Sequence, residues 1–131
     1  MKNMEYTPEI HKPITLDEGS ISEFDYVISS FGTHPVTYVR IPDNHPYYKK
    51  SCDDLDIACH GGLTISGDNL EAIPDKKGWW LGWDYAHAGD YLGFSDMLKI
   101  TSWKDGKKWI TEEIKADVQN VIEQLEIAKT L

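Results

Sequence analysis

Residues that could do chemistry gather between positions 45 and 90. Three histidines, His45, His60 and His87, stand at or beside the ends of segments with strand-like composition. Carboxylates, glycines and hydroxyls accompany them at Asp53, Asp54, Asp56, Gly61, Gly62, Thr64, Ser66, Asp84 and Asp90. Imidazole and carboxylate groups bind metal ions, transfer protons or contact polar ligands. The cluster is therefore compatible with several kinds of site.

A metal site would use His60, His87 and Asp84, since neutral imidazole and carboxylate are common ligands of zinc and of harder ions. The spacing matches no metal motif, because the sequence has no His-x-x-x-His and no Cys-x-x-Cys pair. Because the residue types fit a metal but their spacing does not, a metal-dependent hydrolase that uses these three residues and Asp90 is only the alternative hypothesis. No Ser, Thr or Cys stands in a recognisable nucleophile setting. The missing metal motif and the missing nucleophile together favour a protein that is not an enzyme and has no cofactor, with a bound metal as the alternative.

A pocket for a small anionic ligand, without turnover, is the leading hypothesis. Adjacent glycines let backbone N–H groups approach an anion closely. The histidines and Arg40 would neutralise the charge of a phosphate, and aromatic rings would stack on a base. Thr64 and Asp84 would form hydrogen bonds to sugar hydroxyls. We therefore expect a nucleotide-like ligand. The expected ligand-binding residues are Arg40, His45, Tyr47, His60, Gly61, Gly62, Thr64, Trp83, Asp84, His87 and Asp90.

A structural interpretation competes with the pocket. Buried histidines often only donate to carbonyl groups, and glycines often occupy turns or bulges. Each residue taken singly favours this interpretation, whereas the cluster as a whole favours a site. A protein-binding inhibitor of a host factor is a further alternative, because aromatic residues fall in or beside expected loops of an acidic chain. These are Tyr47, Tyr48, Tyr91, Phe94, Trp103 and Trp109.

Charge narrows the class of partner. The 131 residues include 13 Lys and Arg against 22 Asp and Glu, a formal charge of −9. This balance argues against binding to the nucleic-acid backbone and to anionic lipid. No apolar run approaches the roughly 20 residues that span a bilayer, so we expect a cytosolic protein without membrane contact. Cys52 and Cys59 are too few for a disulfide framework and are expected to be reduced.

The elements that must position the cluster follow from apolar spacing. We expect a single domain over residues 1–131, with an N-terminal arm or irregular segment over 1–20 and a core over 21–131. Strand-like runs cover 21–30, 36–41 and 79–86, and another covers 53–66 with a break at the glycine pair. In the run 79–86, alternate residues share a face: Trp79, Leu81, Trp83 and Tyr85 on one side, Trp80, Gly82, Asp84 and Ala86 on the other.

The C-terminal segment has the spacing of an amphipathic helix. One apolar stripe consists of Ile110, Ile114, Val118, Val121, Leu125 and Ala128. Thr111 is the expected N-cap, and the following glutamates suit the helix dipole. Strands first and a helix last predict an α+β fold, in which a long C-terminal amphipathic helix packs on a small antiparallel or mixed sheet.

Two motifs resemble a family of small acidic proteins encoded by bacteriophages and prophages. They are His-Gly-Gly-Leu-Thr at 60–64, and Trp-Trp-Leu-Gly-Trp-Asp at 79–84 running into Ala-His-Ala-Gly-Asp at 86–90. A strand like 38–42 and a His-Pro element like His45-Pro46 precede them in the family, and the resemblance covers about residues 24–130. Tyr85 stands where the family has Cys, and 35–37 where it has a Cys-Gly pair, which argues against a cysteine-based mechanism.

The resemblance implies a biological context, infection of bacteria by phages, but no particular chemical reaction. It implies a protein of the bacterial host cytoplasm, and phages encode small proteins that sequester the nucleotide signals of bacterial immunity. In that setting the expected function is counter-defence by binding an immune signal without turnover. A symmetric homo-oligomer with pockets at its subunit interfaces would suit such a role.

Overall fold

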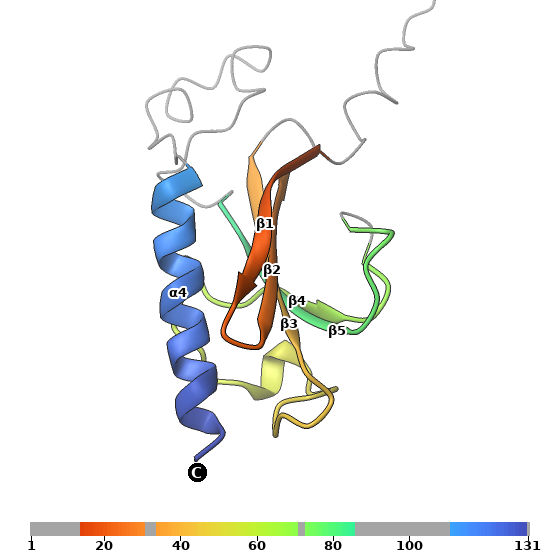
Figure 1. Ribbon diagram of the computed structural model, residues 1–131, viewed down its shortest axis with the longest axis vertical. Helices are drawn as coiled ribbons and strands as arrows, with labels where there is room; N and C mark the ends of the chain where they lie inside the picture. The colour runs from red at the N-terminus through yellow and green to blue at the C-terminus, as the bar shows by residue number, and fades with distance from the viewer. Residues whose placement is uncertain (1–13, 31–33, 71–72, 86–110, 131) are drawn as a thin grey trace, which may run out of the picture.

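Five antiparallel strands form one sheet, and a long helix packs across one of its faces (Figure 1). The computed structural model describes residues 14–30, 34–70, 73–85 and 111–130. The strands, in the spatial order β1-β2-β3-β5-β4, are β1 (Ile14–Ile21), β2 (Phe24–Ser30), β3 (Pro35–Ile41), β4 (Ile65–Gly67) and β5 (Trp79–Asp84). A 3₁₀ turn, η2 (Cys52–Asp54), precedes β4, and the helix is α4 (Thr111–Ala128). The predicted α+β fold is confirmed.

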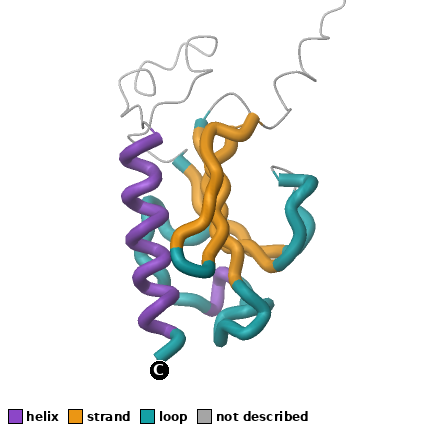
Figure 2. Tube along the Cα trace, viewed as in Figure 1, coloured by secondary structure: helices purple, strands orange, loops and turns teal. Residues whose placement is uncertain are grey.

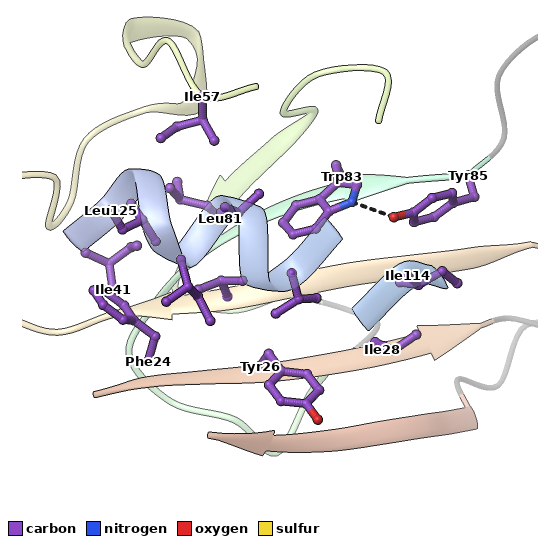
Figure 3. Close-up of a cluster of buried hydrophobic side chains, with 14 residues drawn as sticks. Phe24, Tyr26, Ile28, Ile41, Ile57, Leu81, Trp83, Tyr85, Ile114 and Leu125 are labelled. Carbon is purple, nitrogen blue, oxygen red and sulfur yellow. Dashed lines mark hydrogen bonds between the residues drawn. The ribbon is translucent and has the colours of Figure 1, made fainter. Parts of the chain in front are cut away.

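Alternation along β5 sorts its side chains to the two faces as predicted. Leu81, Trp83 and Tyr85 are buried under α4, together with Phe24 of β2 and Ile41 of β3 (Figure 3). Trp80 points to the opposite face, where it joins Val27 and Tyr38. Predicted site residues can therefore lie close together only if their side chains are on the same face of the sheet.

The apolar stripe of α4 is also confirmed for the residues that the structure describes. Ile114, Val118, Val121, Leu125 and Ala128 are buried against the sheet, and Ile122 joins them. Thr111, expected as the N-cap, is the first residue of the helix. Ile110 lies outside the described residues. Among those residues no helix is both long and apolar enough to cross a bilayer.

Gly82 allows the sheet to close around β5. A Cβ there would lie 2.6 Å from Cδ1 of Tyr38 and 2.7 Å from Cγ2 of Ile65, distances at which carbon atoms overlap. The absence of a side chain at Gly82 leaves room for the ring of Tyr38 from β3 and for the side chain of Ile65 from β4.

Two expectations about local structure were wrong. Residues 14–20, expected in an arm, form β1, an edge strand whose Ile14 and Leu16 side chains are exposed. The side chains of this edge strand are mostly exposed on both faces, so its sequence lacks the alternation of buried and polar positions by which a strand is recognised. Of the expected strand 53–66, only Ile65 and Ser66 belong to a strand, β4, which continues to Gly67. Residues 55–64 are a loop beside α4 (Figure 2).

Candidate functional site

The structure divides the expected ligand-binding residues among separate places. His60, Gly61 and Gly62 lie in the loop beside α4, and Trp83 is buried on the same face of the sheet. Arg40 and Asp84 belong to the opposite face. His87 and Asp90 lie outside the described residues, as do Tyr91, Phe94, Trp103 and Trp109. The single pocket expected from the sequence is therefore not assembled by the described residues.

His60 belongs to a polar cluster at the end of β5. Its ring stacks on the ring of Tyr85, with centroids 4.6 Å apart and planes 9° from parallel. The Tyr85 hydroxyl donates to Oδ2 of Asp117 over 2.9 Å. The same hydroxyl accepts from Nε1 of Trp83 over 3.1 Å (Figure 3). The backbone N–H of His60 donates to the same Asp117 oxygen over 3.1 Å. Asp117 thus joins the loop, β5 and α4.

Electrostatics at this cluster argue against a nucleophile. Burial, followed by the charge of Asp117, raises the pKa of the Cys59 thiol to about 12. Burial also raises the pKa of Tyr85 far above its ordinary value, although the hydrogen bond from Trp83 acts in the opposite direction. Both groups stay protonated at neutral pH. A thiolate mechanism, already disfavoured by the sequence, has no support in this geometry.

The loop that carries His60 is held by two amide side chains of α4. Oε1 of Gln124 accepts from the Ala58 N–H over 2.8 Å, and its Nε2 donates to the Ala58 carbonyl over 2.7 Å. Nδ2 of Asn120 donates to the same carbonyl over 2.9 Å. Gly61 and Gly62 then turn the chain with φ of 70° and 81°, the left-handed region that favours glycine. Thr64 follows, and its N–H bonds to the carbonyl of Gly82 over 2.9 Å.

His45 has a structural role. It is 5% exposed, and its Nε2 donates to the carbonyl of Leu125 over 2.8 Å. Its Nδ1 accepts from the N–H of Tyr47 over 2.9 Å, so the ring is held as the neutral Nε2–H tautomer. The rings of Phe24 and Tyr47 meet it edge to face. His45 therefore links the loop after β3 to the C-terminal part of α4 through a hydrogen bond, rather than facing a ligand.

Asp84 and His60 lie on opposite faces of the sheet. Asp84 pairs in register with Val36 of β3 and faces Tyr38, whose pKa rises to about 12 through burial and then the charge of Asp84. In the part of the chain described, no three His, Cys, Asp or Glu side chains gather at a distance that could hold a metal ion. The described geometry therefore gives no support to a metal site that joins His60 to Asp84.

Arg40, one of the predicted ligand-binding residues, lines a cleft. A cleft of about 390 Å³ opens on the face away from α4, between the strand residues Asp25 and Arg40 and the loop residues Asp75, Lys76 and Lys77, with Trp80 in its wall. A neighbouring cleft of about 470 Å³ is lined by Arg40, Pro42, Asn44 and Tyr48, among others. Arg40 borders both spaces, so a ligand in either one would meet its guanidinium.

Ion pairs organise this face. Nε of Arg40 donates to Oδ2 of Asp25 over 2.9 Å, and Nζ of Lys76 lies 2.7 Å from Oε1 of Glu18. Burial works to raise the pKa of Asp25, but hydrogen bonds from Ser20 and Arg40 and the charges of Arg40 and Lys76 outweigh it and lower that pKa. Asp25 is therefore ionised at neutral pH and holds the guanidinium in place.

Sequence reasoning missed Asp25, Lys76 and Asp117. Asp117 carried a signal, since it follows Ile114 by three positions and precedes Val121 by four, which places a carboxylate at the edge of the apolar stripe. Lys76 lies in a segment that was expected to be only a polar connection. Comparisons with protein families, curated proteins and solved structures found no match to this chain.

Proposed function

We propose that the protein binds a small anionic ligand, without turnover, in the cleft bordered by Arg40. The observation that carries the proposal is that Arg40, Lys76 and Lys77 line one cleft together with Glu18, Asp25 and Asp75, so this cleft is charge-balanced in a chain with a formal charge of −9. The three basic side chains come from β3 and from the loop before β5. A cleft of this size is in the range that small-molecule sites occupy.

The ion pair between Arg40 and Asp25 is weak enough for a ligand to replace Asp25 as the partner of Arg40. Arg40 and Asp25 side chains are 32% and 44% exposed, so the pair contributes at most about 1 kcal/mol to stability and can be exchanged for a ligand contact. The Asp25 bond uses Nε of the guanidinium. Two oxygens of a phosphate group can approach the terminal nitrogens of the same guanidinium.

A nucleotide-like ligand is the class that we propose. Arginine and lysine suit a phosphate. The neighbouring cleft, lined by Asn44, the Tyr48 ring and the carboxylates of Glu23 and Asp43, would suit a base and the hydroxyl groups of a sugar. The resemblance to phage-encoded proteins supports a signal of host immunity as the biological ligand, with counter-defence as the role. No step of this proposal requires a metal or a nucleophile.

Isothermal titration with AMP and with inorganic pyrophosphate tests the site. Arg40→Gln should weaken binding at least tenfold, since it removes the cation that borders both clefts. Asp25→Asn should strengthen binding by roughly fivefold, because it removes the carboxylate that competes for Arg40. Lys115→Gln, a cation on the helix side of the sheet, is the matched control and should leave the affinity unchanged.

The opposite signs of the two substitutions make the outcome decisive. Absence of binding by the wild-type protein, or an equal loss in Arg40→Gln and Lys115→Gln, would contradict the proposal. Native mass spectrometry of protein purified from bacteria, followed by denaturation and identification of released molecules, names the physiological ligand. Conversion of AMP to any product during titration would show turnover and reject a binding-only role.

A further inference from the structure

The seam between α4 and the β1–β2 hairpin is closed at one end and open at the other. Toward the start of α4, Nζ of Lys115 lies 5.8 Å from the centre of the Tyr26 ring, and the Tyr26 hydroxyl donates to Asp17 over 3.1 Å. Toward the end of α4, the seam widens into a groove of about 530 Å³. Its apolar surface comes from Ile21, Ile122 and Ile127.

Exposure shows that the groove is not filled by the hairpin. Ile127 is 62% exposed, although its neighbours on the helix, Ile122 and Leu125, are buried. Ser22, at the tip of the hairpin, has a φ of 57° and lines the groove beside Ile21. An isoleucine this exposed beside a groove is a natural anchor for an incoming apolar side chain.

Charge around the groove is negative. Glu123 and Glu126 line it, and no lysine or arginine is among the described residues of its lining. Lys129, just beyond α4, is shared between Glu23 and Glu126, so its charge is already balanced there. An apolar floor with an acidic rim selects a partner that is apolar and basic.

We infer that this groove binds a basic amphipathic helix of a partner protein. A second copy of this chain would bring a like-charged surface against the rim, and an anionic membrane would be repelled for the same reason. A helix with apolar residues on one face and lysine or arginine on its flanks meets both requirements, in the helix-in-groove mode of recognition. The groove lies on the helix side of the sheet, so this inference does not depend on the Arg40 cleft.

Fluorescence anisotropy with two labelled peptides tests the inference. The first is a synthetic helical peptide of leucine and lysine with its leucines at i, i+3, i+4 and i+7, and the second has the same composition with its leucines scattered around the helix. The first should bind and the second should bind at least tenfold more weakly. Ile127→Asn should weaken binding of the first peptide at least tenfold, and Glu123→Gln about threefold with a smaller dependence on salt.

Ile14→Asn is the matched control, because Ile14 is 57% exposed but lies at the opposite end of β1 from Ile21. It should bind the first peptide as the wild type does. Unchanged circular dichroism and melting temperature of Ile127→Asn would show that it is folded. Equal binding of the two peptides, no binding of either, or equal effects of Ile127→Asn and Ile14→Asn would overturn the inference.

Discussion

The ring of His60 lies parallel to the ring of Tyr85, and the carboxylate of Asp117 accepts a hydrogen bond from each of these residues. The loop, the end of β5 and the first half of α4 therefore meet at one oxygen atom. This arrangement fixes the backbone and the ring of His60 just before the turn at Gly61 and Gly62.

Tyr85→Phe should lower the free energy of unfolding by about 1–3 kcal/mol. The change removes the acceptor of the buried Trp83 N–H and one of the donors to Asp117. Urea denaturation monitored by tryptophan fluorescence measures the effect. Tyr48→Phe, a half-buried tyrosine outside this network, is the control, and equal effects of the two substitutions would contradict the role assigned to the hydroxyl.

Thr37→Val should raise the free energy of unfolding by about 1 kcal/mol. Thr37 is fully buried, and its hydroxyl has no hydrogen-bond partner among the residues that the structure describes. Valine keeps the shape and removes the unpaired polar atom. Ser29→Ala should have the opposite sign, since the equally buried Ser29 hydroxyl donates to the carbonyl of Ile14. A loss of stability in Thr37→Val would mean that the hydroxyl is hydrogen-bonded in solution.

Gln124→Ala should destabilise the protein by about 1–2 kcal/mol and expose the loop before His60. Gln124 satisfies both the N–H and the carbonyl of Ala58. Hydrogen exchange followed by NMR should show faster exchange at the Ala58 amide. Gln119→Ala changes an exposed glutamine of the same helix and should leave that amide protected; similar exchange in both variants would argue against the clamp.

Stability should fall as the pH rises from about 9 toward 12. The folded state keeps protons on Cys59 and Tyr38, whose pKa values rise to about 12, whereas the unfolded chain releases them near pH 9 and 10. The unfolded state therefore binds fewer protons in this window, and the free energy of unfolding decreases with pH. Urea denaturation at pH 8 and pH 10.5 should show a smaller loss in Cys59→Ala than in the wild type. Identical losses would refute the contribution of the thiol.

The strands and the helix that bury a regular face could be predicted from their spacing. Trp79, Leu81 and Trp83 alternate because they face α4, and the stripe of α4 repeats because it faces them. Residues 55–64 show why such patterns mislead. Leu55, Ile57 and Leu63 alternate like a strand, but the backbone of Ala58 bonds to side chains of α4 instead of a neighbouring strand.

The candidate site could be predicted only in part. Arg40 was identified and does border a cleft, but its partners Asp25 and Lys76 come from segments whose polar residues look like ordinary solvated surface. His45 looked like a ligand-binding residue because its acceptor, the carbonyl of Leu125, lies at the far end of the chain. Contacts between distant segments leave no trace in local spacing, so the sequence grouped residues that the sheet separates.

The position of β5 has a consequence for the order of folding. β1, β2 and β3 are consecutive and antiparallel, so they can associate through short turns. Of the described strands, only β5 pairs with β4, although β4 precedes it in the chain. β4 therefore has no strand to pair with until β5 is present, and β5 joins β3 through a contact between distant segments, a kind of contact that forms slowly. During synthesis β4 thus leaves the ribosome before its only described partner strand exists.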